Sequence, residues 1–394
     1  MRAKIQLSLA LAATIPWLAS FVMKYHYPPE VEALLAGSAV VGAAFLISWA
    51  AETAEIDVPR SFSLAVVALL AILPEYAVDA YFAWMAGKVG GDYVHYATAN
   101  MTGANRLLIG VGWSLVVLIA MLKLKRRDVE LDERLNLEIF FLLAATIYSF
   151  KIPLFGEISL FDSVVLISLF AAYVFAATRA EREEVELVGV PMWLASFSKS
   201  KRRSAVVLLM AYAAFTIFIS VEAFAEGLIA TAKNIGIDEF IVVQWVAPLA
   251  SEAPEFVIAI YLVNRLRVAA AMNALISSKV NQWSLLIGTI AVVYSVSLMQ
   301  PHPLPLDARQ REEVFLTAAQ SLFGLAVILD RRINVFEALL LLALFVTQLA
   351  IPSYEVRLAI SAVYVILGVP ILFAKRRELP KILAYTLSLH GRKF

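Results

Sequence analysis

Long apolar stretches, separated by short polar segments, recur along the whole chain. Most are roughly twenty residues long, which is the length that a helix needs to cross about 30 Å of hydrocarbon. The short alternating segments of a membrane β-barrel do not occur. The pattern predicts an all-α polytopic membrane protein with about 12 transmembrane helices, at residues 5–23, 31–51, 61–86, 93–122, 137–150, 158–178, 204–232, 239–263, 268–298, 313–329, 335–351 and 357–373.

The first apolar stretch, the fourth stretch and the longest polar connection each allow a further prediction. Arg2 and Lys4 precede the first stretch, as in a secretory signal peptide, but its length and Trp17 favour a retained helix. Glycines interrupt the fourth stretch, and we expect a bend or break near Gly103. The longest hydrophilic connection is 179–203, and we expect its middle, residues 190–197, to lie in the membrane interface as a short amphipathic segment.

Two parts of the chain carry similar sequences. AILPEYAVDAYFAWMAGK (71–88) is followed by ATANMTGANRLLIG (97–110), and a related pattern fills residues 245–284. Placing Glu75 on Glu255 brings Asn100 near Asn273 and puts Arg106 on Lys279. Such internal similarity indicates two repeats. We assign five helices to each, at 31–178 and 204–352; the loop 179–203 joins them, and 1–30 and 353–394 add one helix at each end.

The basic residues orient this arrangement. Most of the 33 Lys and Arg residues fall on one side of the predicted helices, and the positive-inside rule places that side in the cytoplasm. Both termini are then cytoplasmic, and the two repeats run in opposite directions through the membrane. Inverted repeats are a common plan of secondary transporters, with the site near the midplane where the repeats meet. We expect a multi-pass plasma-membrane protein of a prokaryote.

Composition narrows the function classes. The chain is 61% hydrophobic and only 16% charged, with a net charge of +1, so nothing favours a nucleic-acid partner. Disulfide and thiol chemistry are excluded because the chain has no cysteine. The four histidines are scattered and lack the spacing of a zinc site. Neither His-Glu-x-x-His nor a Gly-x-Gly-Asp pair occurs on the helices, so an intramembrane enzyme is not expected.

Charged residues inside the predicted helices are the first functional candidates, because each costs about 2.5–3.5 kcal/mol at the membrane centre. They are Glu75, Asp79, Arg106, Glu222, Glu226, Glu252, Glu255 and Lys279. Pro74 and Pro254 immediately precede two of the glutamates, and proline displaces a backbone carbonyl one turn earlier. Carboxylates beside freed carbonyls offer the hard oxygen ligands that suit Na⁺ or Ca²⁺. Crowded carboxylates also favour protonation, so H⁺ is a third candidate.

Simpler roles remain open for several of these residues. Asn100 and Asn273 could hydrogen-bond neighbouring helices, and Ser277 could be a small packing residue. Glu222 and Glu226, one turn apart, could line a vestibule or reach the outer face. Glu52, Glu55 and Asp57 are expected to form a solvated helix end. For Glu75 and Glu255 packing is a weak explanation, because Pro-Glu pairs stand at matched positions of both repeats.

The two inverted Pro-Glu helices, each followed by an Asn-containing helix, resemble the α-repeats of the cation/Ca²⁺ exchanger superfamily, which includes Na⁺/Ca²⁺ exchangers. The resemblance implies that Glu75 and Glu255 coordinate the transported cation, and it places the family's serine on Ser277 and its Asn or Asp on Asn281. Repeat one has Ala104 and Leu108 at these two positions. The family's Thr-Ser before Pro-Glu corresponds to Ala71-Ile72 and to Ser251-Glu252. Arg106 and Lys279 stand where the family is apolar.

We therefore expect a secondary antiporter that exchanges Ca²⁺ or another small cation for Na⁺ or H⁺, without a tightly bound cofactor. Its partners are the lipid bilayer and small cations. The candidate cation ligands are Glu75, Asp79, Ser251, Glu252, Glu255, Ser277 and Asn281, with Asn100, Asn105, Arg106, Glu222, Glu226, Asn273 and Lys279 around them.

Two alternatives stay open. One is a transporter of this fold with a different substrate, in which Arg106 and Lys279 replace bound cations or pair with Asp79 and Glu252. The other is a non-transporting membrane sensor or scaffold.

Overall fold

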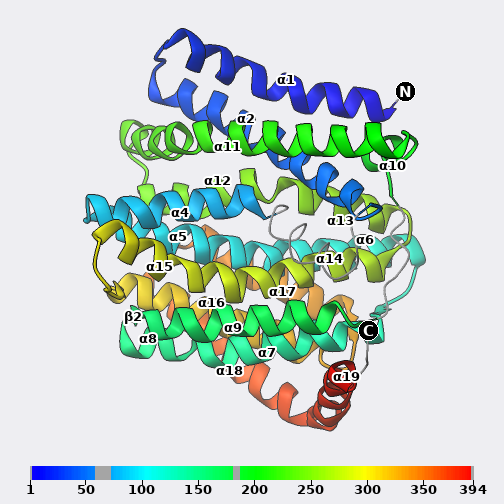
Figure 1. Cartoon of the computed structure of the whole chain (residues 1–394). Coiled ribbons are helices and arrows are strands. Elements are labelled where there is room, and N and C mark those ends of the chain that lie inside the picture. The colour runs from blue at the N-terminus through cyan, green and yellow to red at the C-terminus, as the bar shows by residue number, and fades with distance from the viewer. Residues whose placement is uncertain (1, 58–71, 181–186, 392–394) are drawn as a thin grey trace. The chain divides into compact units, whose positions relative to one another are not determined.

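The computed structural model describes residues 2–57, 72–180 and 187–391 (Figure 1). These residues are almost entirely helical, as the apolar pattern predicts. Within them, eight helices are long and apolar enough to cross a membrane, or nine if one bent pair counts as a single span. The expected number of about 12 is not confirmed, and the expected helix 61–86 lies partly outside the described residues. The chain divides into two compact units, Met1–Phe82 with Glu181–Pro254, and Ala83–Ala180 with Glu255–Phe394.

The first unit is built around two long helices. α2 (Pro29–Ala54) packs along α11 (Lys199–Ile235), and α1 (Arg2–Met23) packs on α2 (Figure 1). Gly37 allows the close approach, since a Cβ there would meet the ring of Phe224 at 2.8 Å. The short helix α10 (Val190–Ala195) packs against α2 and α1, within the segment expected to be amphipathic. α12 (Glu239–Ser251) and the first part of α4 (Leu73–Lys88) complete the unit.

A salt bridge joins the ends of α2 and α11. Arg202 donates to both carboxylate oxygens of Asp57, at 2.7 and 2.8 Å. These hydrogen bonds hold the pKa of Asp57 below its ordinary value, with the nearby Arg203 and Lys199 charges acting in the same direction. Asp57 was expected to be part of a solvated helix end; its side chain is instead only 8% exposed.

The second unit combines helices from both predicted repeats. The first repeat supplies α5 (Asp92–Leu107), α6 (Ser114–Leu124), α7 (Asn136–Ser149), α8 (Lys151–Phe155) and α9 (Leu160–Ala177). The second supplies most of α13 (Ala253–Asn264), then α14 (Val268–Asn281), α15 (Ile287–Leu298), α16 (Ala308–Ile328) and α17 (Val335–Ala350). α9 packs on α15, α17 on α6, and α16 on both α5 and α7. The helices of the two repeats are therefore interleaved.

Two small antiparallel sheets, which the sequence pattern did not predict, also link the repeats. β1 (Asp128–Glu130) pairs with β4 (Arg332–Asn334), and β2 (Glu157–Ile158) pairs with β3 (Leu304–Pro305). Each sheet takes one strand from each repeat. The helices that follow β2 and β4 both begin with a capping box, formed by Ser159 with Asp162 and by Asn334 with Glu337.

A bend or break was expected near Gly103, but α5 continues through this residue to Leu107. The irregularity comes later, as a π-helical segment at Leu108–Trp113. The second repeat has a matching π segment at Gln282–Leu286, between α14 and α15. Both segments end at the same distance after the matched residues Arg106 and Lys279. Such π segments are rare and occur often at functional sites.

The C-terminal part of the chain, where one helix and a basic tail were expected, contains a second helix. α18 (Tyr354–Ala374) is the additional membrane helix, and it packs along α16. A further helix, α19 (Leu379–Gly391), follows and packs against α7. Lys375 anchors the turn between them through Asp330, at 2.9 Å.

The close packing of the first π segment against α17 can be tested at Gly110. A Cβ at this position would overlap the ring and Cβ of Phe345 on α17, whereas a Cβ at Gly112 would meet only the movable ends of Leu275 and Phe256, at 3.2 and 3.4 Å. Gly110→Ala is expected to destabilise the protein by about 1–3 kcal/mol, the usual cost of overpacking. Gly112→Ala, the matched control, is expected to have a much smaller effect. Thermal unfolding in detergent measures both, and equal tolerance of the two variants would contradict the close approach.

Candidate functional site

Both Pro-Glu pairs stand in the first turn of a helix. α4 begins at Leu73 and α13 at Ala253, so each proline is the second residue of its helix and each glutamate the third. Proline fits there because its missing amide hydrogen would have no intrahelical acceptor. The positive end of the helix dipole favours an ionised carboxylate in the same turn. Glu75 and Glu255 therefore occupy equivalent and electrostatically favourable positions in the two repeats.

The start of α13 is also a break in the chain. α12 ends at Ser251, and α12 and α13 together form a bent pair with an angle of 57°. Glu252 lies at the break, and its backbone amide donates to the carbonyl of Pro248 at 2.9 Å. The hydroxyl of Ser251 donates back to the carbonyl of Ala247 at 3.3 Å. A broken membrane helix with acidic residues at the break is a typical feature of transporter sites.

The first unit contains Glu75, Asp79, Ser251 and Glu252, which are all buried. Asp79 follows Glu75 by one turn of α4. Glu226 is half-buried on α11 and accepts a hydrogen bond of 2.7 Å from Tyr81 of α4, while Glu222 is exposed. Tyr81 was not among the expected residues, because a tyrosine in an apolar helix carries no distinctive signal.

The second unit contains the remaining candidates: Asn100, Asn105, Arg106, Glu255, Asn273, Ser277, Lys279 and Asn281. Because Glu75 and Glu255 belong to different units, their meeting at a shared site stays a prediction. The pairs Arg106–Asp79 and Lys279–Glu252 stay predictions for the same reason.

Lys279 and Asn105 lie together where the helix of one repeat meets that of the other. The fully buried Lys279 ammonium on α14 donates to the side-chain oxygen of Asn105 on α5 at 2.8 Å and to its backbone oxygen at 3.2 Å. It also lies 4.4 Å from the centre of the Trp283 ring, in the second π segment. The sequence alignment placed Lys279 opposite Arg106 in the repeats but gave no sign of this contact with Asn105.

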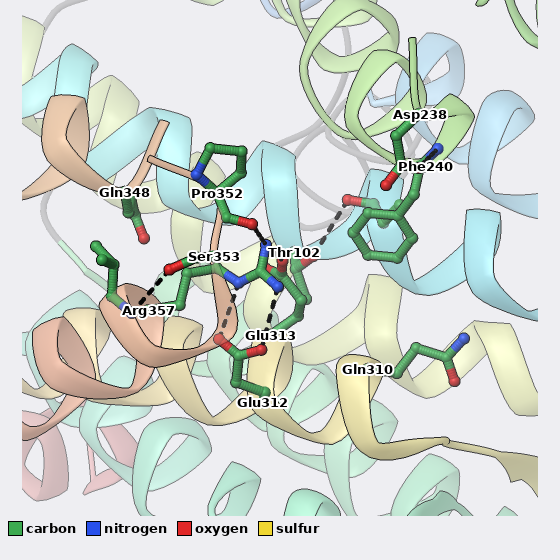
Figure 2. A network of polar contacts seen from close by, with 12 residues as sticks. Thr102, Asp238, Phe240, Gln310, Glu312, Glu313, Gln348, Pro352, Ser353 and Arg357 are labelled. Atoms are coloured by element: carbon green, nitrogen blue, oxygen red, sulfur yellow. Dashed lines mark hydrogen bonds and ion pairs between the residues drawn. The ribbon is translucent and has the colours of Figure 1, made fainter. Parts of the chain in front are cut away.

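Arg106 belongs to a buried ion-pair network that the sequence did not reveal. Its guanidinium lies 2.5 Å from a carboxylate oxygen of Glu313 on α16 and donates to Gln348 on α17 at 3.1 Å. Arg357 of α18 donates to both oxygens of Glu312, at 2.8 and 3.2 Å, and lies 3.3 Å from Glu313. Figure 2 shows Arg357 facing the two glutamates. Two arginines and two glutamates balance in formal charge.

Ser277, an expected cation ligand, faces another carboxylate. Its side chain lies beside Glu138 of α7 and Tyr173 of α9, and Tyr173 donates to Glu138 at 3.2 Å. The sequence pattern did not single out four charged residues of these networks, Glu138, Glu312, Glu313 and Arg357. Each stands near the end of an expected membrane helix, where a charge is ordinary.

The family model described as sodium/calcium exchanger protein matches residues 33–179 and 205–354. A search of curated proteins finds no match.

Among solved structures, the crystal structure of the H⁺/Ca²⁺ exchanger CAX is similar over 99% of both chains, with 61% identity and a TM-score of 0.96. Native YfkE is 17% identical, with a TM-score of 0.64 over 92% of this chain and 100% of its own. The sodium-calcium exchanger NCX_Mj is 19% identical, with a TM-score of 0.52 over 82% of this chain and 98% of its own. These last two show a shared fold alone.

The family model covers most of the chain, and both Pro-Glu helices lie inside the matched residues. The chain is an integral membrane protein that belongs to the sodium/calcium exchanger protein family, within the cation/Ca²⁺ exchanger superfamily.

Proposed function

We propose that the protein exchanges Ca²⁺ for H⁺ across the membrane by alternating access, with Glu75 and Glu255 as the central ligands. The observation that carries this proposal is the similarity to the H⁺/Ca²⁺ exchanger CAX, at 61% identity over 99% of the chain. Na⁺ as the counter-ion has less support, because the Na⁺/Ca²⁺ relative shares only the fold, at 19% identity.

The chemistry of the two glutamates fits this exchange. An ionised carboxylate is a good ligand for Ca²⁺, which takes six to eight oxygens. A protonated carboxylate is a poor one, because metal ligands must give up their protons before they bind. Ca²⁺ and H⁺ therefore compete for the same oxygens. The helix N-termini that carry Glu75 and Glu255 favour the ionised form, and proton binding on the other side of the membrane releases the metal.

The remaining candidates take supporting roles in this proposal. Asp79 and Glu252 are buried close in sequence to the central glutamates and supply further negative charge. Ser251, Ser277 and Asn281 supply neutral oxygens. Arg106 serves as a structural cation, because Glu313 balances its charge within the same unit. We also propose that both termini are cytoplasmic, since most basic residues fall on one side of the helices.

Transport in proteoliposomes tests the proposal. With an acidic lumen, Ca²⁺ should enter while a pH indicator reports alkalinisation of the lumen. Glu75→Gln and Glu255→Gln should each reduce this uptake on the order of tenfold or more, because a ligand charge is lost. Glu355→Gln, at an exposed position at the start of α18, is the matched control and should transport normally. Uptake that needs a Na⁺ gradient and ignores the pH gradient would contradict the proposal.

The structural role of Arg106 has its own test. Arg106→Gln leaves the carboxylate of Glu313 buried without its closest cation, which typically costs about 3–5 kcal/mol. We expect a lower melting temperature in detergent, and a substantial recovery in the double variant Arg106→Gln/Glu313→Gln. If Arg106 instead replaced a transported cation, the single variant would keep its stability and the second substitution would bring no recovery.

A further inference from the structure

Glu138, in the first turn of α7, is a half-buried carboxylate outside the set of proposed cation ligands. It accepts a hydrogen bond of 3.2 Å from the hydroxyl of Tyr173 on α9. Ser277 of α14 lies beside both side chains. Three helices of the second unit therefore converge on one carboxyl group. Among the residues that the structure describes, no Lys, Arg or His side chain lies within ion-pair distance of Glu138.

Asp162 and Glu313, two fully buried carboxylates of the same unit, each have a cation beside them. Asp162 accepts from Lys151 at 2.6 Å, and Glu313 lies 2.5 Å from a guanidinium nitrogen of Arg106. A carboxylate in such a pair stays charged, because losing its charge would leave the cation without a partner. Glu138 is held by a hydroxyl group instead, so no fixed cation ties it to one charge state.

The comparison of the two repeats makes this difference specific. Glu138 and Glu313 stand at the start of the fourth expected helix of their repeats, in the similar triplets Glu-Ile-Phe and Glu-Val-Phe. Arg106 and Lys279 also occupy matched positions. Arg106 of α5 pairs with Glu313 of α16, whereas Lys279 of α14 donates to Asn105. The ion pair between α5 and α16 therefore has no equivalent between α14 and α7.

The charges around α7 leave this carboxyl group to its hydroxyl neighbours. Asp132, at the cap that precedes α7, contributes a further negative charge. Other charged side chains on the helices packed against α7 have partners of their own: Lys151 with Asp162, Lys279 with Asn105, Glu312 with Arg357, Glu313 with Arg106, and Lys381 with Glu378.

Hydroxyl neighbours suit a carboxyl group that gains and loses a proton. An ionised Glu138 can accept hydrogen bonds from both Tyr173 and Ser277. A protonated Glu138 can still accept from Tyr173 on one oxygen and donate from the other to Ser277, because a serine hydroxyl both donates and accepts. Both states keep their hydrogen bonds, and only the charge of the carboxyl group changes.

We propose that Glu138 is a proton-binding residue of the exchange, which takes up and returns one proton beside the cation ligand Ser277. The inference rests on the proposed H⁺/Ca²⁺ exchange. The proton adds to a carboxylate oxygen and leaves from the same group, and no other bond is made or broken. α7 follows the mostly charged segment 123–135, so Glu138 links this polar end of the helix with Ser277, the tenth residue of α14. Tyr173 is a positioning residue, since its hydroxyl holds the carboxyl group.

Infrared spectra of the purified full-length protein in detergent test proton binding without transport. A protonated carboxyl group has a carbonyl stretching band that the ionised group lacks. Titration around neutral pH should show such a band in the wild type, and the band should be missing in Glu138→Gln. Glu138→Asp keeps a carboxyl group and should retain a band, while Glu355→Gln, at an exposed position, should match the wild type. Identical titrations of the wild type and Glu138→Gln would overturn the proposal.

Tyr173→Phe provides a second variant that leaves the carboxyl group in place. It removes the hydroxyl that donates to Glu138 but keeps the aromatic ring. The pH at which the band appears should therefore differ from that of the wild type. If Glu138→Gln does not fold, this variant decides the matter, and an unmoved band overturns the proposal.

Transport in proteoliposomes separates this inference from the proposed function. Ca²⁺ uptake by Glu138→Gln should fall on the order of a hundredfold, the lower end of what a positioned proton-transfer group supplies. Ca²⁺ should still raise the melting temperature of this variant as it does in the wild type, since no proposed cation ligand is lost. Uptake equal to that of the wild type would overturn the inference and leave H⁺/Ca²⁺ exchange standing. If the wild type shows no such exchange, the proposed function fails, and the infrared titration decides proton binding at Glu138 by itself.

Discussion

Each charge placed inside a membrane has to be compensated, and the structure of this protein follows from how it meets that requirement. The glutamates of the two repeats stand in the first turns of helices, where the helix dipole favours an anion. Arg106 is matched by Glu313, and Lys279 by the oxygens of Asn105 and the ring of Trp283. The irregular parts of the backbone lie close to the same residues. Glu252 occupies the break between α12 and α13, and the π segments follow Arg106 and Lys279.

The repeats have diverged in side chains but keep matched backbone features. α4 and α13 begin two residues before their glutamates. A π segment lies at matched places in the two repeats, between α5 and α6 and between α14 and α15. Each small sheet takes one strand from each repeat. The buried ion pairs are not matched in this way. Glu312 and Glu313 lie on α16 of the second repeat, and Arg357 lies on α18, just beyond the residues that the family model covers.

Much of the fold could be predicted from the sequence, because membrane helices are long apolar runs and the repeats share the Pro-Glu pattern. The expected count of about 12 membrane helices is not confirmed within the described residues, since α16 begins with several charged residues and α17 is short. The π segments and the sheets depend on tertiary contacts, such as Gly110 against Phe345, that no local pattern encodes. Glu313 escaped notice because a charge at a helix end is unremarkable until Arg106 is found beside it. A functional role for Glu75 and Glu255 could be predicted from the sequence, because placing a carboxylate in a membrane helix costs free energy that few structural roles would justify.

The central claim is that Ca²⁺ and H⁺ compete for the carboxylates of both repeats. The most direct test is the release of protons when Ca²⁺ is added to the purified protein in weakly buffered detergent solution near neutral pH. The account predicts that protons appear with Ca²⁺ binding and that fewer appear in Glu75→Gln and in Glu255→Gln, because metal ligands must lose their protons. Ca²⁺ binding without any proton release would contradict it.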